Sequence, residues 1–248
     1  MSLLTSEDPA PFCTRNLEGQ GRFLLFCDHA GRAIPRRLGT LGLDDTHLER
    51  HIAWDIGIAT FAERLSDLLD APLFLARYSR LVIDCNRRLE DPSSIAQESD
   101  GIAVPGNRGL SADERRSRAD EIFLPYHKAL AQAIETRKRQ GPLAVLSLHS
   151  FTPIMGGTRR PWEIGLLWNR DARLVAPLMD ALSAQGVCVG DNQPYSGRDE
   201  HGYSMERHAE THDLPHCLIE VRQDLIARPE DARTWAERMA MILRDIYP

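Results

Sequence analysis

The sequence contains no uninterrupted apolar stretch close to the roughly 18 residues that a membrane-spanning helix requires. Its N-terminal residues, MSLLTSEDPAPF, have no basic segment followed by an apolar core, and therefore do not resemble a secretory signal. Dense blocks of Lys and Arg are also absent, and the 248 residues carry a formal net charge of −6. These absences argue against membrane and nucleic-acid partners, and they predict a soluble, unexported protein that acts on small molecules.

Cysteine is sparse, and its spacing contains no CxxC pair. The five cysteines, an odd number, are widely separated along the chain: Cys13, Cys27, Cys85, Cys188 and Cys217. Three of them lie in strand-like apolar contexts, where a reduced cysteine packs as a small apolar side chain. The pattern favours a reducing compartment, so we expect a cytoplasmic protein.

Short apolar runs alternate with longer helix-like segments, which is typical of the α/β class. The length favours one large domain over residues 1–248, and no internal repeat interrupts it. Strands are expected at residues 22–29, 72–79, 80–86, 143–148, 162–168 and 217–221. Helices are expected at about 44–69, 111–139, 171–185 and 228–247, with a loop rich in Pro, Gly and Ser at 89–111.

Several of the expected strands end on polar residues. These residues are His29, Asp84 to Arg87, His149 and Glu220. Open α/β sheets build their sites at the carboxyl edges of the strands, so the side chains are expected to meet there. Two histidines and a glutamate are the ingredients of a hydrolytic zinc site, in which three protein ligands leave one position for water.

Each of these residues also has a purely structural interpretation. A single strand-end histidine is more often a hydrogen-bonded core residue than a ligand. An ionised Glu220 inside an apolar strand is costly without a partner, and a buried ion pair with Arg222 or Arg80 would meet that need. His51 and Asp55 share one face of the expected helix, and their spacing suits two metal ligands or an ordinary hydrogen bond.

Two further stretches have weaker functional signals. His208, His212 and His216 are four residues apart, but Pro215 interrupts a helical pattern, so a solvated helix end is expected there. Residues 190–204, GDNQPYSGRDEHGYS, are rich in turn-forming residues, and a substrate loop is expected there only from its context.

Taken in order, a set of short motifs resembles the N-formylglutamate amidohydrolase family. The motifs are CDHAGRAIP, HIAWDIG, SRLVIDCNR, LSLHSFTP, EIGLLWNRD, NQPYSG and LIEVRQDL, and the resemblance runs from about Phe23 to Leu225. That family is related in fold to zinc-dependent carboxypeptidases. The resemblance implies a three-layer α/β/α domain of the zinc-exopeptidase and phosphorylase/hydrolase kind, with a mixed, mostly parallel central sheet.

The resemblance also implies which residues bind a metal ion. His29 of DHAG and His149 of LHSF match zinc ligands, and Glu220 matches the general base. The carboxypeptidase pattern has a glutamate ligand three residues after the first histidine, and that position here is Arg32, which cannot ligate a cation. Asp55 of the WDIG motif is the expected third ligand, and the alternatives are Asp28 and His51.

The substrate-binding residues are likewise implied by the motifs. The SRLVIDCNR segment matches the region that binds a substrate carboxylate or polarises the scissile carbonyl, with Arg80 in the catalytic role. Salt bridging at the strand end, such as Arg87 to Asp84, is the structural alternative. The expected substrate contacts are Arg80, Asn86, Arg87, Tyr195, Ser196 and Gly197.

The activity implied is zinc-dependent, or otherwise metal-dependent, hydrolysis of an N-formyl or N-acyl amino acid such as N-formyl-L-glutamate, with Glu220 as the base. The partner is then a small acidic substrate, and a homo-oligomer is left open. Two alternatives stay open as well. One is a carboxypeptidase-like hydrolase of peptides or other amides, and the other is an inactive relative that binds a small acidic ligand or a metal.

Overall fold

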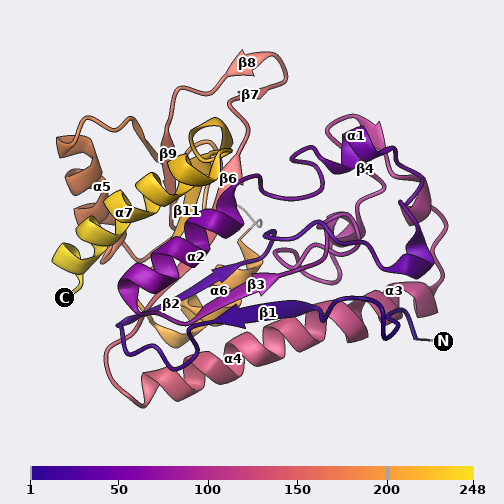
Figure 1. The fold of residues 1–248 in the computed structure, drawn as a ribbon, viewed down its shortest axis with the longest axis horizontal. Helices are drawn as coiled ribbons and strands as arrows, with labels where there is room; N and C mark the ends of the chain where they lie inside the picture. The colour runs from indigo at the N-terminus through magenta and orange to yellow at the C-terminus, as the bar shows by residue number, and fades with distance from the viewer. Residues whose placement is uncertain (1, 199–201) are drawn as a thin grey trace.

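A seven-stranded sheet forms the centre of the computed structural model, which describes residues 2–198 and 202–248 (Figure 1). Its strand order is β1-β3-β2-β6-β11-β9-β10. The strands are β1 (Phe12–Arg15), β2 (Phe23–Cys27), β3 (Leu73–Ala76), β6 (Ala144–Phe151), β9 (Ile164–Leu167), β10 (Val189–Asp191) and β11 (His216–Arg222). Two short hairpins, β4 (Glu98–Ser99) with β5 (Ile102–Ala103) and β7 (Ile154–Met155) with β8 (Thr158–Arg159), lie outside this sheet.

Most neighbouring strands run parallel. β3, β2, β6 and β11 form a parallel block, and β9 with β10 forms a second parallel pair. β1 pairs antiparallel with β3, and β11 pairs antiparallel with β9. The central strands β2, β6 and β11 are buried along their whole length, as expected where both faces of a parallel sheet are covered. The predicted mixed, mostly parallel sheet is confirmed.

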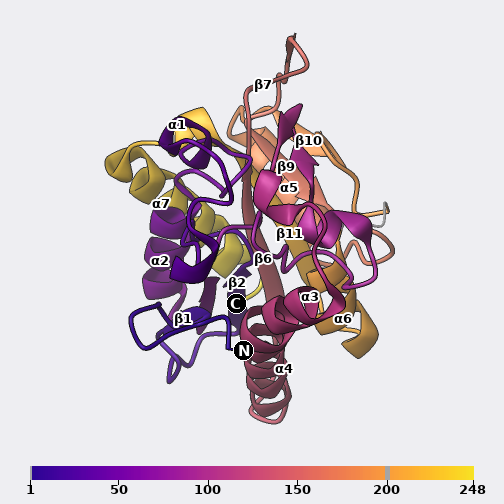
Figure 2. The same cartoon turned by 90° about the vertical axis from the view of Figure 1, so that its right-hand side faces the viewer.

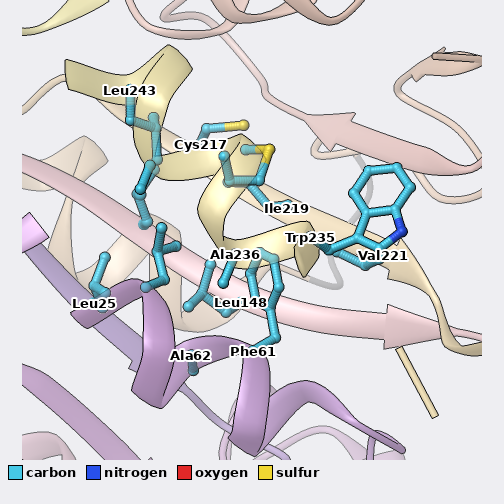
Figure 3. Packing of buried hydrophobic residues seen from close by; sticks show 14 of the residues in the cluster. Leu25, Phe61, Ala62, Leu148, Cys217, Ile219, Val221, Trp235, Ala236 and Leu243 are labelled. Atoms are coloured by element: carbon cyan, nitrogen blue, oxygen red, sulfur yellow. The ribbon is translucent and has the colours of Figure 1, made fainter. Parts of the chain in front are cut away.

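Helices cover the two faces of the sheet, so the chain forms three layers (Figure 2). On one face α2 (Ile58–Leu69), α5 (Val175–Ala184) and α7 (Pro229–Ile246) share one apolar core with the strands. Figure 3 shows this packing, in which Phe61, Trp235 and Leu243 meet strand residues such as Leu148 and Ile219. A second core joins the other face to α4 (Leu124–Lys138) and α6 (Tyr203–His208). The α/β class is confirmed, and in the described part of the chain no helix has the length and apolar character needed to cross a membrane.

The helix predicted over residues 44–69 is wrong in its middle. The chain forms α1 (Asp45–Leu48), which Asp44 caps by accepting the backbone N–H of His47, and then leaves the helix until α2. Gly57 at the start of α2 has a φ of +80°, and a Cβ there would lie 2.1 Å from the carbonyl oxygen of Ile226. The left-handed turn therefore favours glycine, and in the break between α1 and α2 the backbone N–H of Asp55 donates to the carbonyl oxygen of His29 at 3.0 Å.

The strand predicted over residues 80–86 is also wrong, because this segment forms consecutive turns among the described residues. Side chains, and not a neighbouring strand, form hydrogen bonds with its backbone carbonyls. Asn107 Nδ2 donates to the carbonyl of Leu81 at 2.8 Å, and Arg118 Nη1 donates to that of Val82 at 2.8 Å. The buried apolar run thus satisfies its polar backbone through side chains from a distant loop and helix.

The remaining elements largely follow the sequence pattern. The helix expected at 111–139 consists of α3 (Ala112–Arg118), one π-helical turn (Ala119–Phe123) and α4. It starts with a capping box between Ser111 and Glu114. The sequence interpretation missed β1, β10, α6 and the four strands of the two short hairpins.

Candidate active site

A cavity of about 620 Å³ opens at the carboxyl ends of β2, β6 and β11. Polar side chains from separate strands and loops converge there, as the strand-end argument predicts. Every residue expected in the site lines this cavity: His29, Asp55, Arg80, Asn86, Arg87, His149, Tyr195, Ser196, Gly197 and Glu220. Segments that are distant in sequence therefore form one site.

His29, Asp55 and His149 form a buried cluster whose ligand atoms all lie within 4.8 Å of one another. Asp55 Oδ2 is 2.9 Å from His149 Nδ1 and 3.5 Å from His29 Nδ1. His29 follows β2, His149 lies in β6, and Asp55 comes from the break before α2. Two imidazole nitrogens and a carboxylate oxygen facing one another are a donor set that suits zinc and similar divalent ions.

The far nitrogens of both imidazoles are also bonded. His29 Nε2 lies 2.7 Å from Asp84 Oδ1, and His149 Nε2 lies 3.0 Å from Ser147 Oγ. Acceptors at this position commonly fix the ring orientation of metal-binding histidines and leave the other nitrogen free to ligate. His29 Nδ1 is buried and has no hydrogen-bond partner in the described part of the chain, which also suits a ligand.

The alternatives for the third ligand lie to either side of this cluster. Asp28 Oδ2 is 3.6 Å from His149 Nε2, and therefore on the side of the ring that faces away from Asp55. His51 Nδ1 is 3.5 Å from Asp55 Oδ1, so His51 contacts the outer oxygen of the carboxylate. Only Asp55 among the three places an oxygen against Nδ1 of both His29 and His149.

The cluster binds positive charge strongly. Although burial opposes ionisation, the charge of His29 and the hydrogen bond from His149 hold the pKa of Asp55 well below its usual value. Burial also disfavours protonated His149, yet the neighbouring carboxylates of Asp28 and Asp55 raise its pKa to about 10. Without a metal ion, a proton therefore resides beside Asp55, where a metal ion would compete with it.

Glu220 lies directly opposite His149 in the parallel pairing of β11 with β6. Burial, followed by the charge of Asp55, raises the pKa of Glu220 to about 7. Its Oε2 atom is buried and lacks a hydrogen-bond partner among the described residues. Arg222 is engaged elsewhere, since it donates to Asp224 Oδ1 at 2.8 Å and to two backbone carbonyls, so the structure does not support an ion pair between Glu220 and Arg222.

Arg80 links the metal-binding cluster to the segment that follows it. Its guanidinium lies 3.4 Å from Asp55 Oδ1 and 3.3 Å from Asp84 Oδ2. Asp84 Oδ1 in turn accepts the backbone N–H of Asn86 at 2.8 Å. The arrangement places Arg80, Asn86 and Arg87 on one wall of the cavity, beside the cluster.

The predicted substrate loop forms another wall after β10. Tyr195 accepts a hydrogen bond from Arg160 Nη1 at 3.1 Å, and the Gly197 N–H donates to Asn192 Oδ1 at 2.9 Å. On β9, the other neighbour of β11, the residue opposite Glu220 is Gly165. A Cβ at Gly165 would lie 2.0 Å from the carbonyl oxygen of Gln193, so this loop packs directly on β9. Residues 199–201 of the predicted loop lie outside the described residues.

Sequence reasoning missed the roles of the residues that support this site. Asp84 and Ser147 lie within the SRLVIDCNR and LSLHSFTP motifs, but nothing in those motifs predicted that they orient His29 and His149. The expectation of a solvated helix end at His208 and His216 is wrong, because both side chains are buried: His208 ends α6, and His216 begins β11. His208 is hydrogen-bonded to His127, a residue that no sequence motif marks.

An α/β sheet with two histidines, a carboxylate and a buried glutamate at the carboxyl ends of its strands has the arrangement of a hydrolase. The model of the N-formylglutamate amidohydrolase family matches residues 21–227, and the chain belongs to this family. The family resemblance seen in the sequence motifs is thereby confirmed, together with the prediction of an amidohydrolase.

A curated relative and two solved structures resemble the chain over most of its length. The chain is 24% identical over 218 residues to the N-formylglutamate deformylase of Pseudomonas aeruginosa, which covers 81% of this chain and 79% of that protein. A crystal structure of a gene product from Agrobacterium tumefaciens superposes with a TM-score of 0.95 at 33% identity, over 98% of this chain and 97% of the other. An N-formylglutamate amidohydrolase from Ralstonia eutropha shares the fold, with a TM-score of 0.74 at 21% identity over 96% and 97% of the two chains.

Proposed function

We propose that this protein hydrolyses the amide bond of N-formylglutamate, or of a similar N-formyl amino acid, and releases formate and the free amino acid. The observation that carries the proposal is the meeting of the His29, Asp55 and His149 cluster with Glu220 in one cavity. Relatives named N-formylglutamate deformylase support the choice of substrate.

The cluster fits one divalent metal ion, and zinc is the ion that we propose. His29 Nδ1, His149 Nδ1 and an Asp55 oxygen would hold it, because these atoms face one another while each far ring nitrogen has an acceptor. When bound, zinc would acidify a water molecule and polarise the amide carbonyl.

Glu220 moves the protons of the reaction. A carboxylate whose pKa is raised to about 7 is close to the ideal for a group that must both accept and return a proton near neutrality. Glu220 takes a proton from the attacking water as the oxygen–carbon bond forms. It then gives that proton to the amide nitrogen as the carbon–nitrogen bond breaks, so that formic acid and a neutral amine form; the acid proton then passes to the amine, which gives formate and the ammonium form of the amino acid.

The arginines bind negative charge on either side of the reacting carbon. Arg80, which lies 3.4 Å from Asp55 Oδ1, is near enough to the cluster to stabilise the oxyanion that develops on the former carbonyl oxygen. Arg87 and Asn86 are proposed to hold the carboxylate of the substrate, for which the planar fork of a guanidinium offers two parallel donors. Tyr195, Ser196 and Gly197 complete the wall against the rest of the substrate.

The test is to measure metal content and amide cleavage on the same purified protein. The substrates are N-formyl-L-glutamate, N-acetyl-L-glutamate and a dipeptide with a free C-terminal carboxylate, and formate release reports cleavage of the first. About one equivalent of zinc and fastest turnover of the formyl compound are expected. Preferential cleavage of the dipeptide would instead favour a carboxypeptidase-like hydrolase. A protein that binds zinc and N-formylglutamate but turns over none of the three would be an inactive binding relative.

A further inference from the structure

A pair of buried histidines lies behind the wall of the cavity, outside its lining. His127 on α4 and His208 at the end of α6 are each 1% exposed. His127 Nδ1 and His208 Nε2 are 2.8 Å apart, and the two rings are inclined by only 13°. Proton transfer at the reacting amide does not require either residue, so their polar pairing in the core needs a separate explanation.

The pair holds the backbone of the segment Asp84–Arg87, called here the substrate turn. His127 Nε2 lies 2.9 Å from the carbonyl oxygen of Cys85. Because a carbonyl oxygen can only accept, Nε2 of His127 carries a proton and donates it. In the neutral ring Nδ1 then keeps a lone pair, which accepts the Nε2–H of His208.

Burial is consistent with this protonation pattern. It lowers the pKa of His127 to about 4 and that of His208 to about 3, so both rings are neutral near pH 7. One imidazole therefore fixes the tautomer and tilt of the other, and the second fixes a backbone carbonyl.

The beginning of α6 supports the same turn from another direction. Ser204 Oγ donates to the carbonyl oxygen of Cys85 at 3.2 Å, and the Ser204 N–H donates to Asn86 Oδ1 at 3.0 Å. On the other side Asp84 joins the turn to His29 at 2.7 Å. The substrate turn is thus held between the metal-binding cluster and the histidine pair.

A plain packing role would not select these residues. Apolar side chains could fill the space beside Phe123, whose ring lies 4.2 Å from that of His127 between centroids, without removing two imidazoles from water. The gain from the histidines is directional. A hydrogen bond joins His208 Nε2 to His127 Nδ1, and a second joins His127 Nε2 to the carbonyl oxygen of Cys85.

We propose that His127, oriented by His208, is a positioning residue that aims Asn86 and Arg87 into the cavity. It acts through the backbone of the turn and touches neither substrate nor metal. The inference rests on the proposed function in assigning substrate binding to Asn86 and Arg87. Its effect falls on substrate affinity more than on bond cleavage, because Glu220 and His149 are held in the paired strands β11 and β6, outside the turn.

The test compares His127→Leu with His127→Gln, because the glutamine amide can still donate to the Cys85 carbonyl. Ile134→Val, a core change on the same helix away from the turn, is the matched control. His127→Leu should raise KM for N-formylglutamate about 10-fold, the scale of one lost buried hydrogen bond, with metal content unchanged. His127→Gln should recover most of this loss, and His208→Phe should give an intermediate KM. Equal KM values in the Leu and Gln variants, with lowered Tm alone, would overturn the inference.

Hydrogen exchange of the peptide that contains residues 84–87 provides a readout without substrate. Faster exchange confined to this peptide is expected in His127→Leu and in His208→Phe, and it is not expected in His127→Gln or Ile134→Val. Unchanged exchange in both of the first two variants would overturn the inference even if one of them were too unstable for kinetics. If the wild-type protein releases no formate, the proposed function fails, and the exchange measurement still decides whether the pair positions the turn.

Discussion

Glu220 on β11 and His149 on β6 occupy directly opposite positions in two parallel, hydrogen-bonded strands. A parallel register fixes both side chains on the same edge of the sheet, and neither depends on a loop for its position. The proposed base and one proposed metal ligand are therefore held relative to each other by the most buried part of the fold, where β6 and β11 are buried along their whole length.

Metal retention should follow the geometry of the cluster. Ala substitutions of His29, His149 or Asp55 should each remove most of the bound zinc, because each deletes one of three facing donors. Asp28→Ala and His51→Ala are the matched controls and should retain more metal, since their side chains lie outside the cluster. Metal analysis after dialysis measures this order, and wild-type zinc content in Asp55→Ala would transfer the third ligand to a neighbour.

Asp84→Asn tests whether the Asp84 carboxylate orients the imidazole of His29. The amide keeps the size of the side chain but weakens the acceptor that orients the imidazole at 2.7 Å. Loss of such a partner typically lowers metal affinity by about 10- to 100-fold, and competition with a chromophoric chelator would measure it. Ser94→Ala, which alters a neighbouring turn without touching His29, serves as the control, and equal zinc affinity in both variants would refute the orienting role.

Arginine-to-lysine exchanges test substrate binding. Arg87→Lys keeps the charge but removes the planar two-donor fork, so KM for N-formylglutamate should rise several-fold to about 10-fold. Arg80→Lys should lower kcat as well, because Arg80 lies beside the cluster. Steady-state kinetics separate the two effects, and unaltered constants in both variants would leave these arginines with structural roles only.

Stability should fall in mild acid because of the histidine pair. Unfolded histidines titrate near pH 6.5, whereas His127 and His208 in the folded protein titrate at about 4 and about 3. Between these values the unfolded chain binds more protons, so the free energy of unfolding falls as pH drops from about 6.5 towards 4. Denaturant titrations should show this slope reduced in a His127→Gln, His208→Phe double variant. An identical slope in the wild type and the double variant would contradict the assignment of these pKa values.

Sequence reasoning located the residues at the carboxyl ends of the strands, because His29, His149 and Glu220 interrupt apolar runs that would otherwise be pure core. Short-range patterns could not show which buried runs pair as strands. The apolar run at residues 80–86 looks like a strand, yet it is bonded by Asn107 and Arg118 from a later part of the chain.

Long-range contacts also explain why two other predictions, the helix through Asp55 and the solvated His208, are wrong. The helix expected through Asp55 is interrupted after Leu48 and resumes only after Gly57, whose left-handed turn packs against Ile226, a contact across the fold that no local periodicity reports. His208 resembles a solvated residue in sequence, and its burial follows from pairing with His127, which is 81 residues away. Elements with strong local signals, such as α7 and the Ser111 cap, were placed correctly.

The most direct test of the mechanism is Glu220→Gln, assayed for turnover, zinc content and thermal unfolding on one preparation. The amide keeps the shape of the side chain but cannot act as a base, so kcat should fall by about 10²- to 10⁴-fold with little change in KM. Zinc content and Tm should persist, because Glu220 Oε2 has no hydrogen-bond partner in the described chain and Arg222 is bonded elsewhere. If Glu220 were instead one half of a buried ion pair, the variant would lose roughly 3–5 kcal/mol of stability. A protein with lowered Tm and near-normal specific activity would contradict the catalytic role of Glu220.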